Sequence, residues 1–240
     1  MSQISENPTA GVVELDAPRL TLMGDAAVLF EAPGPLLLGT QKRIWACSDG
    51  VAEIAGVVDR QPGMNNLLVV FDPDMLDPAA LETMIMEIWS TAGEDAPAGK
   101  LIELPIRYGG EGGPDLGLVC DHLKLTAEEV ADIHSSAEYV IFAPGTMPGF
   151  GYLFGLPERL FVPRREVPVT RPRTLNVSIA GLQCSIVGPP GAYGAATAPT
   201  GWYMIGKLVD PPMPFDLNAE PPGLMRPGDR IKFVNMGIAP

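Results

Sequence analysis

The sequence predicts an α+β protein in which a small α/β part is followed by an all-β part. Three observations support this prediction. Strand-like and helix-like runs alternate in the first half of the 240 residues, short strand-like runs follow one another from Tyr139 onward, and 27 glycines and 26 prolines interrupt the chain. Regularly spaced short strands between Gly and Pro turns are typical of an antiparallel barrel or sandwich.

The first half is predicted to hold a strand, a helix and a hairpin, at residues 26–32, 35–47, and 51–59 with 66–72. Pro35 suits the first turn of that helix, because its missing N–H would be unpaired there anyway. Gln61-Pro62-Gly63 is a turn signal between the two hairpin strands.

A second helix is predicted to start at Asp77-Pro78, with Asp77 as N-cap and Pro78 at the first helical position. Residues 100–108 are predicted to form the next strand. The resulting order β-α-β-β-α-β is the split βαβ, ferredoxin-like arrangement. Residues 93–99 are either a loop before that last strand or a link between domains. As the domain division we predict an α/β domain over residues 1–95, and a helical connection with a β domain over residues 96–240.

In the second half, two helices are predicted at residues 115–123 and 126–135. Thr126 and Glu129 have the spacing of a capping box at the start of the second. Residues 225–229 (MRPGD) are a turn signal before the final strand. The predicted strands of the β domain are residues 139–143, 159–163, 175–181, 184–188, 202–209 and 230–236.

Charge and composition exclude several classes of function. The 16 Lys and Arg against 29 Asp and Glu give a net charge of −13, which repels nucleic-acid phosphates and anionic membrane surfaces. The three cysteines, Cys47, Cys120 and Cys184, form no CxxC motif, so we expect buried free thiols in a reducing cytosol. The N-terminus lacks the pattern of a signal peptide, and no apolar run reaches the ~20 residues of a membrane span. We expect a soluble, cytoplasmic protein.

Motifs for self-contained catalysis are missing. The sequence contains no phosphate loop (GxxxxGK[ST]), no GxGxxG after a strand, no HExxH and no GxSxG, so we expect no nucleotide cofactor or metal bound by this chain itself. Of the two histidines, His134 ends the capped helix and is a weak candidate for a general acid or base. The alternative is an ordinary histidine at a helix end.

Candidate binding residues lie between positions 148 and 207. Phe150 and Tyr152 flank a glycine in Pro148–Leu153, where the rings form either pocket walls or the core of a barrel corner. Gln183 can orient an amide or a carboxylate, because its side chain both donates and accepts hydrogen bonds. Gly201 and Trp202 follow a turn of short side chains, and Trp202 either stacks on a ligand or fills the core.

Five arginines crowd a short stretch, at positions 159, 164, 165, 171 and 173. Guanidinium groups bind carboxylates through paired hydrogen bonds, so a site for a small anion is one interpretation. The other is a set of solvated arginines paired with Glu158 and Glu166, which is the interpretation favoured for Arg171 and Arg173. Arg164 and Arg165 are expected on opposite faces of a strand, so that one of them can face a site.

The same stretches resemble a known family. Residues 107–157, PRREVP, IAGLQ, APTGWYMIGK and PGDRIKF are similar, in this order, to the family whose members are called allophanate hydrolase subunit 1, the B subunit of 5-oxoprolinase, or KipI. The resemblance covers residues 25–234 and implies a cyclophilin-like β-barrel as the C-terminal domain. It further implies a homologous second subunit with a related barrel, and a third component.

The resemblance implies a non-autonomous subunit of a hydrolase that acts on the C–N bond of a small anionic amide or lactam, with ATP used by the assembled complex. Phe150, Tyr152, Arg164, Arg165, Gln183, Gly201 and Trp202 would then line the substrate site. Two alternatives stay open. One is a KipI-like inhibitor of a histidine kinase, and the other is a carboxyltransferase-type partner of a biotin-dependent carboxylase.

The sequence departs from the family pattern at several positions in these motifs, among them Phe154 in place of a glycine, and four of the departures bear most directly on the site. Gly151 replaces a proline, Leu175 and Ser178 replace glycines, and Ala198 replaces a serine. We expect these changes to alter the shape of the loops and the chemistry of the pocket, while the scaffold is retained.

Overall fold

A computed structural model describes residues 14–95, 99–145, 151–172, 174–186, 197–212, 215–218, 220 and 222–239 of the chain. The chain divides into two compact units, with the boundary between residues 97 and 98. Each unit has its own apolar core. They are described separately below as the N-terminal unit and the barrel unit.

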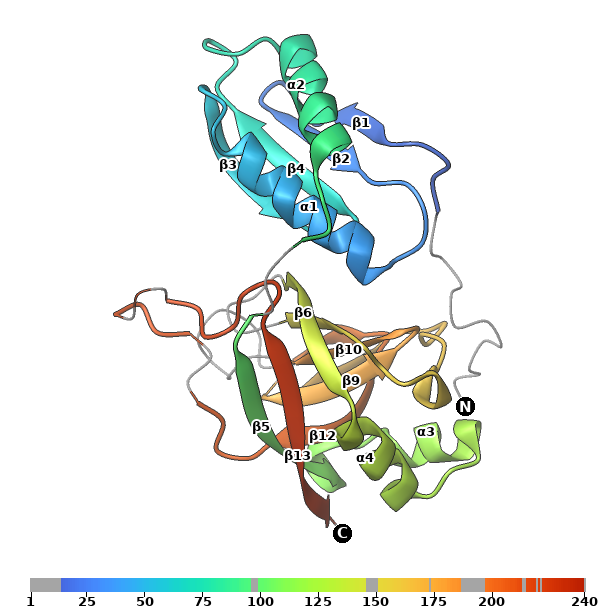
Figure 1. Cartoon of the computed structure of the whole chain (residues 1–240). Coiled ribbons are helices and arrows are strands. Elements are labelled where there is room, and N and C mark those ends of the chain that lie inside the picture. Colours follow the sequence, from blue (N-terminus) through green and yellow to red (C-terminus); the bar gives the residue numbers. More distant parts are fainter. Residues whose placement is uncertain are drawn as a thin grey trace. The chain divides into compact units, whose positions relative to one another are not determined.

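The N-terminal unit is a four-stranded sheet with two helices (Figure 1). Its elements are β1 (Arg19–Leu22), β2 (Ala27–Glu31), α1 (Leu38–Val51), β3 (Val57–Pro62), β4 (Asn66–Phe71) and α2 (Pro78–Thr91). The sheet order is β1-β2-β4-β3, and all neighbouring strands are antiparallel. β2, α1 and β3 therefore form a split βαβ unit with β4 between its two strands, as the sequence predicts.

The predicted fourth strand of this sheet is wrong. Residues 101–109 form β5 (Leu101–Gly109), which belongs to the barrel, and the edge position next to β2 is taken by β1 instead. The sequence did not predict β1 because only Leu20 of its four residues is partly buried, which leaves no apolar alternation to detect. An ion pair between Arg19 and Glu31, 2.6 Å apart, links β1 to β2.

Both helices pack on one face of this sheet (Figure 1). The Asp77 side chain accepts hydrogen bonds from the backbone N–H groups of Ala79 and Ala80, so α2 starts at Pro78 as predicted. α1 starts at Leu38, three residues after Pro35, and its predicted start is therefore wrong. The largest fully buried side chains in the core of this unit are Phe30, Phe71, Ile44, Leu67, Leu81 and Ile85, and Trp89 packs with them at 5% exposure.

A buried amide holds the hairpin turn. Gln41 of α1 is fully buried; its Nε2 donates to the carbonyl of Gly63 (2.8 Å) and its Oε1 accepts from the N–H of Asn65 (2.9 Å). Asn65 has a φ of 53°, in the left-handed region that asparagine tolerates better than most residues. The sequence predicts the hairpin correctly, but its first strand starts at Val57 because α1 continues to Val51.

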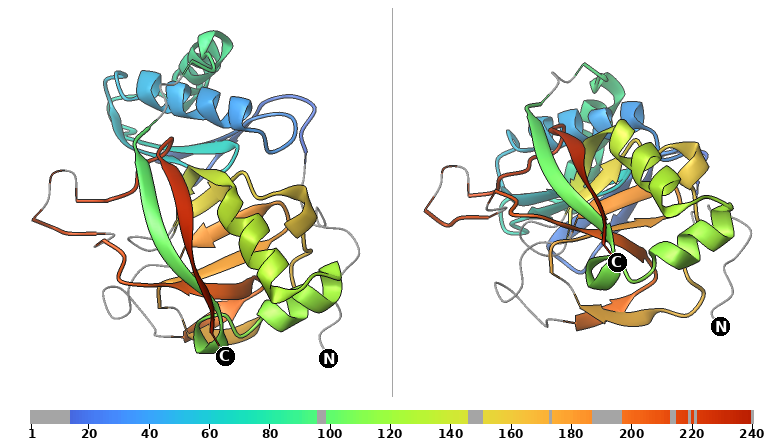
Figure 2. Two further views of the ribbon diagram at one scale, coloured as in Figure 1. Left: turned by 60° about the horizontal axis from the view of Figure 1, so that its bottom comes forward. Right: turned by 90° about the horizontal axis from the view of Figure 1, so that it is seen from below.

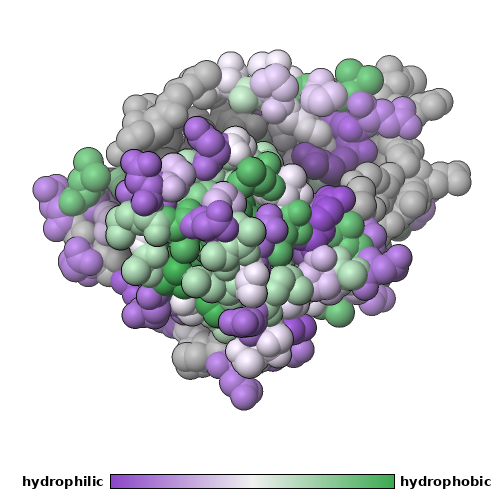
Figure 3. All heavy atoms as spheres, turned by 90° about the horizontal axis from the view of Figure 1, so that it is seen from above, coloured by the Kyte–Doolittle hydropathy of each residue, from purple (hydrophilic) through white to green (hydrophobic). Residues whose placement is uncertain are grey.

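The surface of the N-terminal unit also carries large apolar side chains. The face shown in Figure 3 has hydrophobic and hydrophilic residues lying side by side. The exposed apolar residues of this unit are Leu22, Met23, Leu37, Val58, Met75, Met84 and Met86. Val58 is the extra residue of an irregularity in β3, because Val57 pairs with Phe71 and Asp59 pairs with Val70.

The barrel unit is built on a closed seven-stranded barrel. Its strand order is β10-β7-β6-β13-β5-β12-β9, with β9 returning to β10. The strands other than β5 are β6 (Glu138–Pro144), β7 (Gly151–Phe154), β9 (Asn176–Ala180), β10 (Gln183–Ile186), β12 (Tyr203–Leu208) and β13 (Arg230–Ala239). The prediction of a purely antiparallel barrel needs one correction, because β13 runs parallel to β5 (Figure 2).

Two segments beside the barrel differ from the predicted strands. Residues 159–163 are predicted as a strand, but they contain the short helix η2 (Glu158–Leu160) and a single bridge from Val162 to Gly181. The prolines at both ends of this stretch disfavour a regular ladder. β8 (Val169–Pro172) and β11 (Thr197–Thr200) form a separate two-stranded ribbon, which the sequence did not predict.

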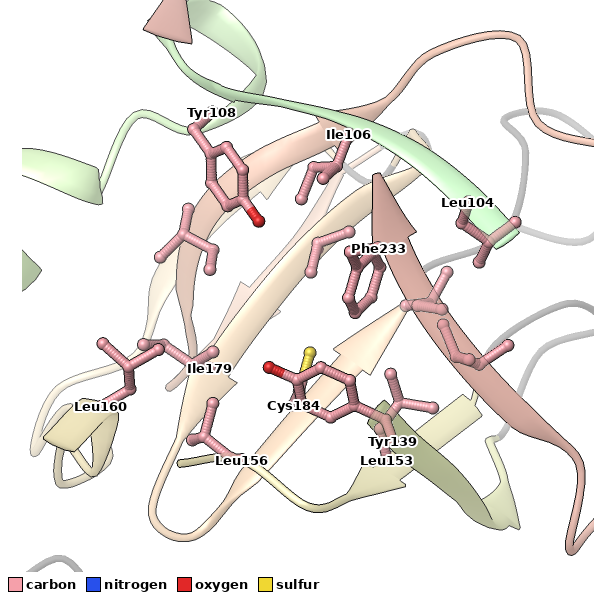
Figure 4. Packing of buried hydrophobic residues seen from close by; sticks show 14 of the residues in the cluster. Leu104, Ile106, Tyr108, Tyr139, Leu153, Leu156, Leu160, Ile179, Cys184 and Phe233 are labelled. Carbon is pink, nitrogen blue, oxygen red and sulfur yellow. The ribbon is translucent and has the colours of Figure 1, made fainter. Parts of the chain in front are cut away.

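Two helices follow β5 and a short 3-10 turn, η1 (Gly110–Gly112). They are α3 (Leu116–Leu123) and α4 (Ala127–Ser136), close to their predicted bounds. The capping box of α4 is present, because Thr126 Oγ1 accepts from the N–H of Glu129 and Glu129 accepts from the N–H of Thr126. Figure 4 shows part of the barrel core, which includes Leu104, Ile106, Tyr108, Tyr139, Leu153, Ile179, Cys184 and Phe233.

Candidate functional site

The candidate site lies on the outer side of three barrel strands. Along β7, β9 and β10, Leu153, Ile179 and Cys184 belong to the barrel core. Successive side chains of a strand point to opposite faces, so Tyr152 and Ser185 share the outer face. These two residues are register partners, and Ser185 also pairs with Ser178.

This outer face is covered rather than open. Ser178 and Ser185 are each only 2% exposed, although neither points into the barrel core. Gln183 lies two residues before Ser185 on the same side of β10 and is also buried. A polar strip that is shielded from water can bind a small polar ligand more strongly than an exposed one, because hydrogen bonds there compete less with solvent.

An arginine and two aromatic rings meet beside this strip. The guanidinium carbon of Arg164 lies 5.8 Å from the ring centre of Trp202, within cation–π range. The rings of Trp202 and Tyr152 are 5.8 Å apart. A Cβ at Gly201 would lie 3.6 Å from Nε of Arg164, so this glycine also borders the cluster. The structure therefore brings together four residues that the sequence analysis named. Phe150 lies outside the described residues.

The side chain of Arg165 does not join Arg164, Tyr152 and Trp202, but pairs with a buried carboxylate. Its side chain is 3% exposed, and its Nη2 lies 2.6 Å from Oδ1 of Asp115, which is fully buried. Nη2 of Arg171 donates to the same oxygen over 2.7 Å. Oδ2 of Asp115 accepts the N–H of Met204 (3.1 Å), and the N–H of Asp115 donates to the carbonyl of Met204 (3.0 Å). We call Asp115, Arg165 and Arg171 the buried ion cluster.

The ion cluster corrects the interpretation of Arg171 as a solvated residue paired with Glu158 or Glu166. Its side chain is 28% exposed, and its partner is Asp115, from a distant part of the sequence. In the sequence, Asp115 stands out only as the start of a predicted helix. The signal available was its position directly after the Gly-Pro pair that ends the 109–114 glycine cluster, inside the string that carries the family resemblance.

The ion cluster holds more positive than negative charge. Two guanidinium groups face one carboxylate, and the guanidinium of Arg165 lies 4.4 Å from the ring centre of Tyr203. Within the described residues, Nε of Arg165, Nε of Arg171 and the hydroxyl of Tyr203 have no hydrogen-bond partner. Burial raises the pKa of the Tyr203 phenol, so this hydroxyl stays protonated at neutral pH.

His134 lies apart from this cluster, inside the barrel core. It is fully buried, and its Nδ1 is 2.8 Å from the hydroxyl of Tyr108 while its Nε2 is 3.4 Å from Sγ of Cys184. Figure 4 shows the Tyr108 hydroxyl and the Cys184 sulfur pointing into the interior. Burial lowers the pKa of His134 to about 3, so the ring is neutral. The structure does not bring His134 to the other candidate residues.

Among the four departures from the family pattern, Leu175 has the clearest structural effect. Its φ is 60°, in the left-handed region that a glycine adopts without strain and a leucine does not. This backbone conformation is one that favours glycine, and here a bulkier residue adopts it. Ser178 adds a hydroxyl to the covered strip, and Ala198 of β11 pairs with Arg171 of β8. A Cβ at Gly151 would make only an ordinary contact, 3.6 Å from Ile141.

Comparison with known proteins identifies the class. The closed barrel fits the cyclophilin-like fold. A solved structure of TTHA0988 is similar to this chain, with a TM-score of 0.69 and 26% identity, over 87% of this chain and 39% of that chain. The chain spans about two fifths of TTHA0988. It belongs to the family described as carboxyltransferase domain, subdomain C and D, whose model matches residues 18–225.

The curated names of similar proteins show which members of this family the chain resembles. The chain is 39% identical over 221 residues to the B subunit of 5-oxoprolinase from Escherichia coli O157:H7, covering 90% of this chain and 95% of that protein. The urea carboxylase of Kluyveromyces lactis shares the fold, with a TM-score of 0.70 and 19% identity over 96% of this chain and 23% of that one. The family resemblance drawn from the sequence is confirmed.

Within the described residues, no group of three or more His, Cys, Asp or Glu side chains is placed to hold a metal ion. None of the helices in the described ranges has the length and apolar character needed to cross a membrane.

Proposed function

We propose that this chain is the B-type subunit of an ATP-dependent 5-oxoprolinase complex, which opens the lactam of 5-oxoproline to glutamate. The observation that carries this proposal is the 39% identity to the B subunit of a bacterial 5-oxoprolinase over 95% of that protein's length. Similarity over nearly the whole length is consistent with both units of the chain contributing to the same role.

The geometry supports a binding role for this chain. A small lactam carrying a carboxylate needs a cation, an apolar wall and an amide partner. Arg164 supplies the cation, Trp202 and Tyr152 supply the wall, and Gln183 lies on the same covered face of the barrel as Tyr152. The histidine best suited to proton transfer, His134, is buried inside the barrel with a pKa of about 3.

The proposed activity needs other components. Lactam hydrolysis driven by ATP requires a phosphate-binding element and an activated water or nucleophile. We assign these to partners: a homologous second subunit with a related barrel, and a third component. This chain would contribute binding residues to a composite site and would show no ATPase or amidohydrolase activity alone.

Two further features bear on how the proposed subunit is organised and on where it acts. We infer that the N-terminal unit and the barrel unit act as separate domains of one subunit. Cys47, Cys120 and Cys184 are all free, as expected of a protein that acts in the reducing cytoplasm.

Reconstitution tests this function directly. The purified chain, the chain with its second subunit, and the chain with both partners are assayed for ATP-dependent formation of glutamate from 5-oxoproline. Turnover is expected only with the partners present. Robust turnover by the single chain, or none by the complete assembly, would overturn the proposal. Tight binding to a histidine kinase without any complex formation would favour the inhibitor alternative.

A second candidate is a carboxyltransferase role. It is favoured by the family description and by the fold shared with urea carboxylase, whose 19% identity indicates the fold alone. In that case the assembly would transfer carboxylate from a carboxybiotinylated carrier protein to a small amide, with no dependence on 5-oxoproline. Adding such a carrier to the reconstituted complex separates the two functions.

A further inference from the structure

Two consecutive arginines have opposite environments. Arg165 is almost completely buried against Asp115, whereas Arg164 is exposed and lies over the ring of Trp202. Within the described residues, no carboxylate forms an ion pair with Arg164, while both Arg165 and Arg171 pair with Asp115. Of these three arginines, Arg164 is the exposed one that has no carboxylate partner within the described residues, so its guanidinium can meet the carboxylate of a ligand.

We propose that Arg164 binds the carboxylate of the substrate, and that the buried ion cluster of Asp115, Arg165 and Arg171 positions it. This inference rests on the proposed function and assigns different roles to neighbouring residues of its site. In this arrangement Arg165 does not contact the substrate. Asp115 and Arg171 affect substrate binding only by fixing the position of Arg164.

Hydrogen bonds show how positioning would work. The N–H of Arg165 donates to the carbonyl of Gly201 over 2.9 Å, so the backbone beside Arg164 is tied to the residue before Trp202. Asp115 is bonded through both its backbone and its side chain to Met204, two residues after Trp202. The Asp115–Arg165 ion pair then links these two contacts to each other, so that Asp115, Arg165 and the segment of residues 201–204 hold one another in place.

Arg171 connects the β8–β11 ribbon to Asp115 as well. Its guanidinium shares Oδ1 of Asp115 with Arg165, and its backbone pairs with Ala198 of β11, in the segment that leads to Gly201 and Trp202. Loss of the Arg171 contact would therefore loosen the segment that carries Trp202. The position of the Trp202 ring relative to Arg164 depends on that segment.

The chemistry of the cluster defines the ligand class. The ion cluster has two guanidinium groups and one carboxylate, and Arg164 adds a third cation next to it, so this part of an otherwise acidic chain attracts small anions. The rings of Tyr152, which is partly buried, and Trp202, which is 9% exposed, lie beside the charge and form a small apolar wall. The fitting ligand is a flat lactam whose ring packs on Trp202 and whose carboxylate meets Arg164.

A pair of related compounds tests the role of Arg164. In the reconstituted complex, the KM for 5-oxoproline is measured together with inhibition by 2-pyrrolidinone, the same lactam without the carboxylate. R164A is expected to raise the KM roughly 10- to 100-fold, the usual effect of losing a hydrogen bond to a charged group. Inhibition by 2-pyrrolidinone should stay unchanged. R159A, at an exposed arginine of η2, is the matched control and should change neither value.

A double-mutant cycle tests the positioning role. R171A alone is expected to raise the KM for 5-oxoproline several-fold, whereas R171A added to R164A should raise it no further. A purely structural defect would add to the effect of R164A and would also weaken 2-pyrrolidinone inhibition. R165K keeps the positive charge but loses the planar guanidinium fork, and is expected to behave like R171A in the same cycle.

Two results would overturn this assignment. One is an unchanged KM in R164A, and the other is full additivity in the cycle. If the wild-type complex does not turn over 5-oxoproline, the proposed function fails, and calorimetric titration of the complex with 5-oxoproline, acetate and glutarate still tests the site. Carboxylate binding that is lost in R164A would support Arg164 as the anion-binding residue. No binding by the wild type, or equal binding by R164A, would contradict it.

Discussion

The imidazole of His134 and the phenol of Tyr108 are hydrogen-bonded inside the barrel, with 2.8 Å between Nδ1 and the hydroxyl oxygen. The backbone carbonyl of His134 also accepts a hydrogen bond from the hydroxyl of Tyr139 (2.9 Å). Both tyrosines belong to the barrel core, so the histidine connects α4 to the interior through polar contacts shielded from water. Such a network restricts which side chains can occupy its place.

The first prediction concerns pH and stability. Because burial lowers the pKa of His134 to about 3 while an unfolded histidine titrates near 6.5, the unfolded chain binds a proton in this range and the folded chain does not. The contribution of His134 to the free energy of unfolding is therefore fully present above about pH 6.5. Below that pH it falls by about 1.4 kcal/mol for each pH unit, down to the folded-state pKa. Urea denaturation between pH 7.5 and 5 measures the slope.

The other histidine provides the control for that measurement. His122 is exposed on α3, so H122Q should keep the pH slope of the wild type. H134Q should reduce the slope over the same pH range, whatever its absolute stability. Equal slopes in H134Q and the wild type would show that His134 is not the group responsible.

The second prediction concerns Asp115. D115N leaves the guanidinium of Arg165 buried without its counter-charge, and the loss of one partner from a buried ion pair costs about 3–5 kcal/mol. We expect a drop of this size in the free energy of unfolding, measured by urea denaturation. D121N, at an exposed carboxylate of α3, should change it by less than about 1 kcal/mol. Similar values for both variants would contradict the structural importance of the ion cluster.

The third prediction concerns the link between the units. Protease Glu-C cleaves after glutamate, and Glu94 is exposed just after α2, whereas Glu103 lies within the hydrogen-bonded ladder of β5. Of these two sites, brief digestion should therefore cut after Glu94 before Glu103, and the barrel fragment released by that cut begins at residue 95. Mass spectrometry of the fragments identifies the cut. Initial cleavage after Glu103 would show that β5 is less protected than its pairing indicates.

The fourth prediction concerns the thiols. Burial raises the pKa of Cys47 to about 11 and also raises the pKa of Cys184, and both side chains are fully buried. Cys120 is only partly buried. Iodoacetamide reacts with accessible thiolates, so in the native protein it should label Cys120 first, and the other two only in denaturant. Labelling of Cys184 as fast as Cys120, measured by peptide mass spectrometry, would contradict the closed barrel core.

Local signals in the sequence predicted local structure well. The Asp77 cap and the Thr126–Glu129 capping box form with residues three or fewer positions away, so their spacing alone identifies them. The helices α2, α3 and α4 follow from these signals and from apolar periodicity. The family resemblance then added the cyclophilin-like barrel, which local patterns had left undecided between a barrel and a sandwich.

Long-range pairing was the part that the sequence could not determine. Residues 101–109 have the alternation of a strand, but alternation does not say which sheet the strand joins, and β5 joins the barrel. The same limit applies to the site. The contacts of Asp115 with Arg165 and Arg171 cross large separations in sequence, and an arginine paired with a distant carboxylate has the same local pattern as a solvated one.

The parallel pairing of β5 and β13 has a consequence for synthesis on the ribosome. β13 lies between β5 and β6, so both of these early strands keep a bare edge until the last ten-residue strand has been translated. The sheet of the N-terminal unit uses only strands that precede residue 72 and can form long before that moment. Bare strand edges attract other chains. A premature stop codon between residues 145 and 229 would therefore leave β5 and β6 with bare edges and yield an aggregating polypeptide rather than a smaller barrel.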